Sequence, residues 1–142
     1  MQKKKKPLIL VSACLAGVPC RYDGEARERS EVLQLLREGL ALPVCPEQLG
    51  GLPTPRAAAE ISDKQVLTQK GQNLTESYRA GADAALALAL KAGVSEAWLK
   101  SKSPMCGCGK IYNGSHTGTL IEGDGVFTQR LKQAGMRIKE ID

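Results

Sequence analysis

Four short apolar runs, separated by longer segments of helical character, are the feature that most constrains the fold of this chain. Each run has the length of a single buried strand. The runs span Pro7 to Ser12, Leu40 to Val44, Ala97 to Lys100, and Met136 to Lys139. The intervening helices are expected over SEVLQLLREG with Ser30 as its cap, from Thr75 to near Gly93, and over VFTQRLKQAG. Strands that alternate with helices predict a mainly parallel α/β sheet flanked by helices on both faces.

The remaining segments are expected to be less regular. GGLPTPRAAAEI, residues 50–61, has prolines and glycines that interrupt regular structure and predict a loop. Gln65 to Thr68 predicts an edge strand or a small hairpin with a turn at Lys70 and Gly71. The glycine-rich stretch 106–125 is expected to be irregular.

The length and the charge indicate one domain with a basic end. The chain has 142 residues, which predicts a single domain over residues 7–142. Lys3 to Lys6 contribute four charges to a net charge of +5, so the body is almost neutral and residues 1–6 are expected to be a disordered, solvated tail. Because a neutral body lacks the basic patch of a nucleic-acid binder, we expect no long nucleic acid as partner. The sequence does not define the oligomeric state.

The N-terminal stretch KKKKPLILVSAC has the outline of a lipoprotein signal, but its apolar run is too short. Pro7 to Val11 is shorter than the roughly 7–15 residues of a signal's apolar region. No apolar run approaches the roughly 20 residues of a membrane span. We therefore expect a cytoplasmic protein with no membrane contact, in a reducing compartment where its five cysteines do not form stable disulfides.

Three of the five cysteines follow predicted strands. Cys14 follows the first strand, Cys45 the second, and Cys106 lies a few residues beyond the third. The carboxyl ends of parallel strands lie at one edge of a sheet, where ligands bind. We therefore expect these three thiols to converge in space, although each alone could be a small buried side chain.

Converging thiolates indicate a metal centre, and two kinds are open. The chain has no C-x-x-C pair, the usual element of a structural zinc site, but His116 could complete a Cys-Cys-Cys-His zinc site. A cuboidal iron–sulfur cluster also suits three thiolates, and leaves one iron free for a soft sulfur donor. A zinc or iron–sulfur module without catalysis is the alternative to an enzyme. A thiol nucleophile assisted by His116 is less favoured, because nothing in the sequence orients such a pair.

The sequence resembles the family that contains the bacterial thiouracil desulfidases. The resemblance lies in three blocks in order, CLAGVPCRYDG, CPEQLGGLPTPRAAAEI and KSPMCGCGKIYNG, and covers nearly the whole chain after the lysines. It implies a small Rossmann-like domain with a 4Fe–4S cluster held by three cysteines. It also implies a non-redox reaction in which a thiolated uracil base or nucleotide loses its sulfur to the open iron and water supplies the oxygen.

The resemblance also implies roles for individual residues. The cluster ligands would be Cys14, Cys45 and Cys106, and Glu47 would be the acid/base. Ser103 would position water or polarise the substrate. Met105 and the Tyr112-Asn113-Gly114 segment depart from the usual pattern, but neither removes a ligand.

Further residues near these blocks are candidates for substrate binding. Arg21, Tyr22 and Asp23 follow the first block and are expected to line the pocket, and Arg56 and Lys102 are candidates for a substrate phosphate. Cys20 and Cys108 are expected to be packing or redox residues rather than ligands, because a fourth cysteine ligand would close the open iron.

Overall fold

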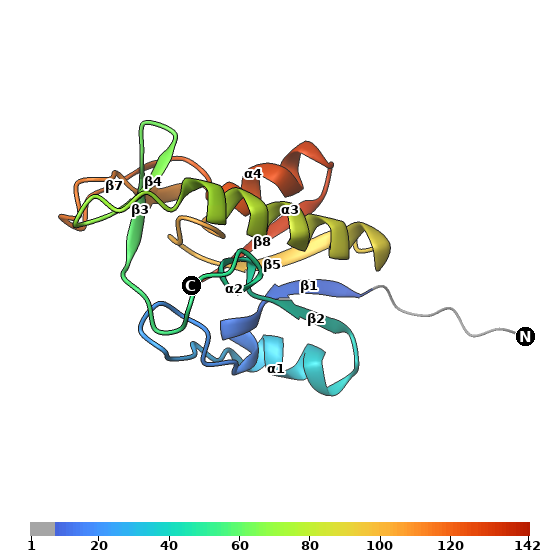
Figure 1. The fold of residues 1–142 in the computed structure, drawn as a ribbon. Helices are drawn as coiled ribbons and strands as arrows, with labels where there is room; N and C mark the ends of the chain where they lie inside the picture. Colours follow the sequence, from blue (N-terminus) through green and yellow to red (C-terminus); the bar gives the residue numbers. More distant parts are fainter. Residues whose placement is uncertain (1–7) are drawn as a thin grey trace, which may run out of the picture.

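The centre of the structure is a four-stranded sheet in which every strand runs parallel to its neighbours (Figure 1). The computed structural model describes residues 8–142, so the expected tail of residues 1–6 lies outside the described residues. The strands are β1 (Ile9–Ser12), β2 (Ala41–Val44), β5 (Glu96–Lys100) and β8 (Arg137–Ile141), in the spatial order β2-β1-β5-β8. They coincide with the four apolar runs, and the predicted α/β fold is confirmed.

Helices cover both faces of this sheet (Figure 1). α3 (Thr75–Lys91) and α4 (Val126–Gln133) cover one face, and α1 (Ser30–Arg37) covers the other. Leu10 of β1 belongs to the core on the α3 and α4 side, whereas its neighbour Val11 packs on the α1 side with Val32. Both strand residues are fully buried, which explains why β1 has a continuous apolar run rather than an alternating one.

Two antiparallel hairpins extend from this core: the first contains the predicted strand Gln65 to Thr68, and each adds strands that the sequence did not predict. β3 (Ala59–Ser62) pairs with β4 (Gln65–Thr68), so the predicted loop 50–61 ends in a strand. Their turn is at Asp63 and Lys64, both with positive φ, and the predicted turn at Lys70 and Gly71 is also present after β4, where the Gly71 N–H donates to the Thr68 carbonyl at 2.9 Å. β6 (Lys110–Tyr112) pairs with β7 (Leu120–Glu122) inside the stretch expected to be irregular. These three-to-four-residue strands depend on pairing with a distant partner, which local composition does not report.

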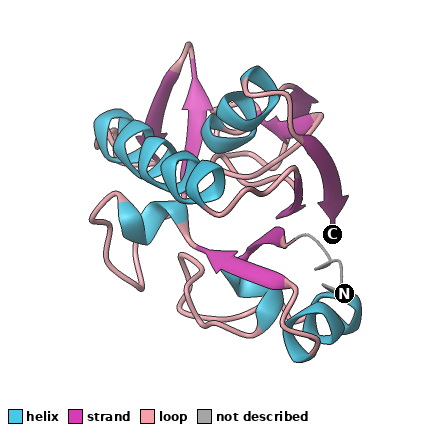
Figure 2. Cartoon of the chain, turned by 90° about the vertical axis from the view of Figure 1, so that its right-hand side faces the viewer, coloured by secondary structure: helices cyan, strands magenta, loops and turns pink. Residues whose placement is uncertain are grey.

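Two short helices follow β1 and β2. The 3₁₀ helix η1 (Ala13–Ala16) follows β1, and α2 (Pro46–Leu49) follows β2. α2 lies directly against the long helix α3 (Figure 2). The approach is close because glycines face each other there: a Cβ on Gly81 would lie 1.9 Å from the Pro46 carbonyl oxygen, and one on Gly50 would lie 2.0 Å from that of Ser77.

The start of α1 differs in one respect from the prediction. Ser30 is the first residue of the helix rather than its cap, and the capping position is Arg29, which makes no side-chain capping hydrogen bond. Over residues 8–142, none of the helices is both long enough and apolar enough to cross a bilayer.

Candidate active site

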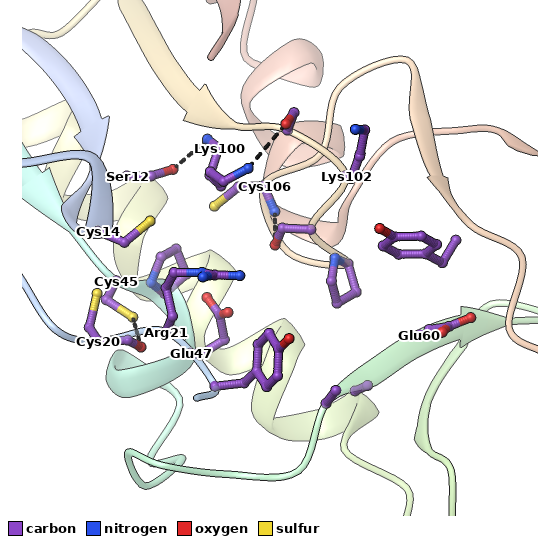
Figure 3. Close-up of a pocket in the computed structure, with 18 of the residues that line it drawn as sticks. Ser12, Cys14, Cys20, Arg21, Cys45, Glu47, Glu60, Lys100, Lys102 and Cys106 are labelled. Atoms are coloured by element: carbon purple, nitrogen blue, oxygen red, sulfur yellow. Dashed lines mark hydrogen bonds between the residues drawn. The ribbon is translucent and has the colours of Figure 1, made fainter. Parts of the chain in front are cut away.

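The carboxyl ends of β1, β2 and β5 border a cavity of about 570 Å³. Cys14 lies in η1 directly after β1, Cys45 follows the last residue of β2, and Cys106 lies six residues beyond β5. All three line the cavity, together with Cys20 (Figure 3). The structure therefore brings together the three cysteines that strand order predicts to converge.

The first two cysteines are held by backbone contacts of the elements that carry them. The Cys14 carbonyl accepts hydrogen bonds from the N–H groups of Gly17 (3.3 Å) and Arg27 (2.9 Å), and the left-handed conformation of Gly17 ends η1. Cys45 is the capping residue of α2, with Pro46 at the first helical position, where its missing N–H costs nothing. The Cys45 carbonyl accepts from the Leu49 N–H at 3.1 Å.

Cys106 lies in a turn organised by Ser103. The Ser103 hydroxyl oxygen accepts from the N–H groups of Met105 and Cys106, both at 3.0 Å, and the Gly107 N–H donates to the Ser103 carbonyl at 2.8 Å. Behind the turn, the Thr128 hydroxyl donates to the Cys106 carbonyl at 2.9 Å. Ser103 also lines the cavity, so the predicted site serine shapes the turn of a predicted ligand as well.

Glu47 and Arg56 form a buried ion pair in the cavity wall. Arg56 Nη2 lies 3.2 Å from Glu47 Oε2, and the two side chains are only 6% and 16% exposed respectively. Burial raises the pKa of Glu47, and the guanidinium of Arg56 opposes that shift without removing it. The result is a carboxyl that holds its proton at higher pH than an exposed one.

Arg56 is largely engaged by the protein itself. Its guanidinium also donates to the carbonyl oxygens of Cys20 (3.0 Å) and Pro53 (3.2 Å) and to the Thr54 hydroxyl (3.2 Å). These bonds leave little of the guanidinium for a substrate phosphate. The structure thus favours a positioning role for Arg56 over the phosphate contact expected from the sequence.

Three of the other four residues predicted to bind substrate line the cavity, and the fourth does not. Arg21, Tyr22 and Lys102 line it. Asp23 is not among the lining residues: its carboxylate accepts from Arg21 Nη1 at 3.3 Å and from the Glu25 N–H at 3.0 Å. Asp23 therefore organises the turn that presents Arg21 and Tyr22, and the expectation that it faces the pocket does not match its position.

Sequence reasoning missed several lining residues. Ser12 and Lys100 are the last residues of β1 and β5, so the strand-end rule that found the cysteines could have found them too. Burial lowers the pKa of the Lys100 ammonium. Tyr78 of α3 and Glu60 of β3 also line the cavity, but no local signal marks them, because they reach it through the packing of α3 and of the hairpin.

Two of the three predicted ligands, Cys14 and Cys106, are in an environment that disfavours thiolates without a nearby cation. Burial, followed by the Glu47 carboxylate, raises the pKa of Cys14 to about 11, and burial raises that of Cys106 well above its usual range. A hydrogen bond with Cys20 lowers the pKa of Cys45. A metal centre supplies the positive charge that buried thiolates require, because a coordinated thiol is deprotonated outright. Three soft thiol donors on one cavity therefore fit an iron–sulfur cluster.

The geometry does not support the alternative of a Cys-Cys-Cys-His zinc site. His116 Nδ1 lies 3.4 Å from Glu60 Oε2, so its ring is engaged by the β3 strand. Over residues 8–142, no three His, Cys, Asp or Glu side chains gather closely enough to hold a single metal ion. A four-iron cluster is larger than one ion and accepts thiolates that stand farther apart.

The fold and the site thus define a small α/β domain with a thiol-lined cavity at the carboxyl edge of its sheet. A model of the 2-thiouracil desulfurase family matches residues 9–142, and the chain belongs to that family, named for a carbon–sulfur bond-cleaving enzyme. The family resemblance seen in the sequence is confirmed.

Two individual proteins are similar over almost the whole chain. The solved structure of the 4Fe–4S-dependent thiouracil desulfidase TudS matches with a TM-score of 0.91 and 43% sequence identity, over 95% of this chain and 91% of that one. The protein YbbK of Bacillus subtilis strain 168 is 42% identical over 141 residues, which cover 92% of this chain and 93% of YbbK.

Proposed function

We propose that this chain is an iron–sulfur-dependent, non-redox desulfidase. It removes the sulfur of a thiolated uracil base or nucleotide, of the thiouracil or 4-thiouridine monophosphate type, and releases the oxo base and hydrosulfide. One observation carries this proposal: Cys14, Cys45, Cys106 and the buried Glu47 line one cavity, in a chain that is 43% identical to a 4Fe–4S-dependent thiouracil desulfidase.

Cys14, Cys45 and Cys106 are assigned as the ligands of a 4Fe–4S cluster. They come from three different strand ends and line the same cavity. When bound, such a cluster supplies an iron without a protein ligand, which is a soft Lewis acid suited to a thiocarbonyl sulfur. The chain's part is to keep these three thiols in place and to limit their contact with bulk water: Cys14 and Cys106 are buried and Cys45 is half-buried.

Glu47 is assigned as the group that moves protons. The reaction exchanges C=S and water for C=O and hydrosulfide, so the attacking water must lose protons and the departing sulfur must be stabilised, with no net transfer of electrons. A largely buried carboxyl with a raised pKa is suited to take up and return a proton in the reaction. The ion pair with Arg56 fixes its orientation.

Ser103, Tyr22, Arg21 and Lys102 are assigned to hold the substrate. The Ser103 oxygen accepts two backbone hydrogen bonds, which leaves its own hydrogen to donate to the substrate or to water. Lys102 is 43% exposed at the cavity and is the cation assigned to an anionic substituent of a nucleotide.

We also place the protein in the cytoplasm, acting on a small molecule rather than on long nucleic acid. A reducing compartment would keep the five cysteines as thiols, the form in which they can act as ligands. The near-neutral charge of the chain beyond Lys6 supports a small substrate.

Anaerobic reconstitution followed by analysis of iron, acid-labile sulfide and turnover tests this function. We expect about four irons and four sulfides per chain, as in the cluster of the similar enzyme, and the broad visible absorbance of iron–thiolate bonds. The loaded protein should then convert 2-thiouracil or 4-thiouridine monophosphate to the oxo form and release hydrosulfide. One tightly held zinc without sulfide would refute the cluster assignment.

Matched variants separate the ligand roles from the acid/base role. Replacement of Cys14, Cys45 or Cys106 by Ser should abolish the cluster absorbance, whereas Cys108→Ser, outside the cavity lining, should retain it. Glu47→Gln keeps the shape of the side chain and should retain the cluster while turnover falls by about 10²–10⁴-fold. A fully active Glu47→Gln enzyme would show that another group moves the proton.

A further inference from the structure

Cys20 has no part in the proposed reaction, yet its side chain lies beside a proposed ligand. It is 2% exposed and belongs to the segment after η1 rather than to a strand end. The sulfur atoms of Cys20 and Cys45 are neighbours in the cavity wall (Figure 3). Cys45 Sγ also lies 3.7 Å from the Cys20 carbonyl oxygen, to which it donates.

The two cysteines are held together by contacts that involve no cluster. Arg56 Nη2 donates to the Cys20 carbonyl at 3.0 Å and to Glu47 Oε2 at 3.2 Å, and the Arg56 N–H donates to the Tyr22 carbonyl at 2.8 Å. One residue thus ties the segment that carries Cys20 to α2, which follows Cys45. The two thiols therefore stay adjacent in the cluster-free chain.

The other cysteines are placed differently. Cys14 is held inside η1, Cys106 lies in the turn after β5, and Cys108 is outside the cavity lining. A disulfide forms most readily where two cysteines already stand side by side. Cys45 Sγ contacts the main chain of Cys20 and the two sulfur atoms are adjacent (Figure 3), so this pair is the one placed to form it.

We propose that Cys20 is the redox partner of Cys45: in the cluster-free chain the two form a disulfide that blocks cluster loading until it is reduced. This inference rests on the proposed assignment of Cys45 as a cluster ligand, but not on the reaction proposed above. It gives Cys20 a function as a reversible modification site.

The step balances with a low-molecular-weight disulfide as oxidant. Cys45, which is half-buried and more accessible than Cys20, attacks one sulfur of that disulfide and releases one small thiol. Cys20 then attacks the mixed disulfide on Cys45 and releases the second small thiol. The two protein thiols lose two electrons and two protons, and the oxidant is reduced to two thiols.

Cross-link mapping of the full cluster-free chain tests the proposal. The chain is incubated with oxidised glutathione, its remaining thiols are alkylated, and non-reduced tryptic peptides are analysed by mass spectrometry. Cys14 and Cys20 lie in the same tryptic peptide, which ends at Arg21, whereas Cys45 lies in the peptide 38–56. Fragmentation of the cross-linked pair, together with Cys14→Ser and Cys20→Ser, identifies which cysteine has joined Cys45.

The expected result is a Cys20–Cys45 cross-link that persists in Cys14→Ser and in the control Cys108→Ser and is lost in Cys20→Ser. The oxidised chain should load no more than about a tenth of the iron that the reduced chain takes up, because a disulfide sulfur is not a thiolate ligand. Dithiothreitol should restore loading. A Cys14–Cys45 cross-link, or glutathione adducts without a cross-link in the unmodified chain, would overturn the proposal. The mapping uses no turnover assay, so its failure would leave the proposed reaction untouched.

Discussion

Replacement of Gly81 by Ala should change the stability of the protein in opposite directions depending on whether helix propensity or the packing of α2 against α3 dominates. Gly81 lies inside α3, where Ala is favoured over Gly by about 1 kcal/mol, so an isolated helix would be stabilised. In the structure the new Cβ would lie 1.9 Å from the Pro46 carbonyl oxygen and 3.0 Å from the Gly50 nitrogen. Both neighbours are backbone atoms of the α2 segment and cannot rotate away.

The size of the effect follows from the movement required. The Pro46 carbonyl would have to retreat by more than 1 Å to reach 3.0 Å, the lower limit of real Cβ contacts, and Cys45 precedes it directly. Overpacking costs about 1–3 kcal/mol, and a backbone clash lies at the upper end. After the gain in helix propensity, we expect the free energy of unfolding to fall by about 2 kcal/mol, or Tm by about 6–8 °C at this chain length.

Thermal unfolding followed by circular dichroism measures this change, with Ala80→Ser as the control. Ala80 is the preceding residue of α3 and is exposed, so one added atom there meets solvent and should shift Tm by little. The displaced α2 should also weaken cluster retention in Gly81→Ala after reconstitution. A Tm of Gly81→Ala above that of the parent chain would refute the close approach of α2 and α3.

Three further predictions concern the core, the thiols and the outer wall of the cavity. Phe127→Ala removes a fully buried ring and should lower the free energy of unfolding by about 3–5 kcal/mol, measured by urea denaturation. In the cluster-free chain the pKa of Cys14 is about 11, which leaves roughly one Cys14 side chain in a thousand as thiolate at pH 8. The alkylation rate of Cys14, measured by mass spectrometry, should therefore rise about tenfold per pH unit up to that pKa. A plateau of that rate below pH 9 would contradict this prediction. Glu60→Ala removes the acceptor of the Gly114 N–H (3.0 Å), so the amide hydrogens of loop 113–118 should exchange faster. The exchange rate of the Ile9 amide, in β1, should be unchanged and serves as the control.

The sheet and its edge were predictable because their signals are local. A buried parallel strand is visible as a short apolar run, and the residue that follows it lies at the ligand-binding edge whatever the details of packing. Position alone therefore placed Cys14 and Cys45 on a common cavity. The same rule, applied more fully, would have added Ser12 and Lys100.

The hairpins and the outer wall were not predictable in this way. Glu60 reaches its place because β3 pairs with β4 and because its carboxylate accepts from the N–H groups of Gly114 and His116, more than 50 residues away. Asp23 was expected at the pocket because it follows the first sequence block, but its carboxylate accepts hydrogen bonds from Arg21 and from the Glu25 N–H within its own turn. Such choices depend on long-range neighbours that no local pattern encodes.

The origin of the three proposed ligands on three separate strand ends bears on the order in which the protein is assembled. Cys14 and Cys106 are 92 residues apart in sequence and become neighbours only when β5 pairs with β1. A C-x-x-C pair, which this chain lacks, could capture a metal while most of the chain is still unstructured, whereas the three proposed ligands meet only in the completed sheet. On the proposed ligand assignment, folding precedes cluster loading, and each newly made chain passes through a folded state whose thiols have no metal partner.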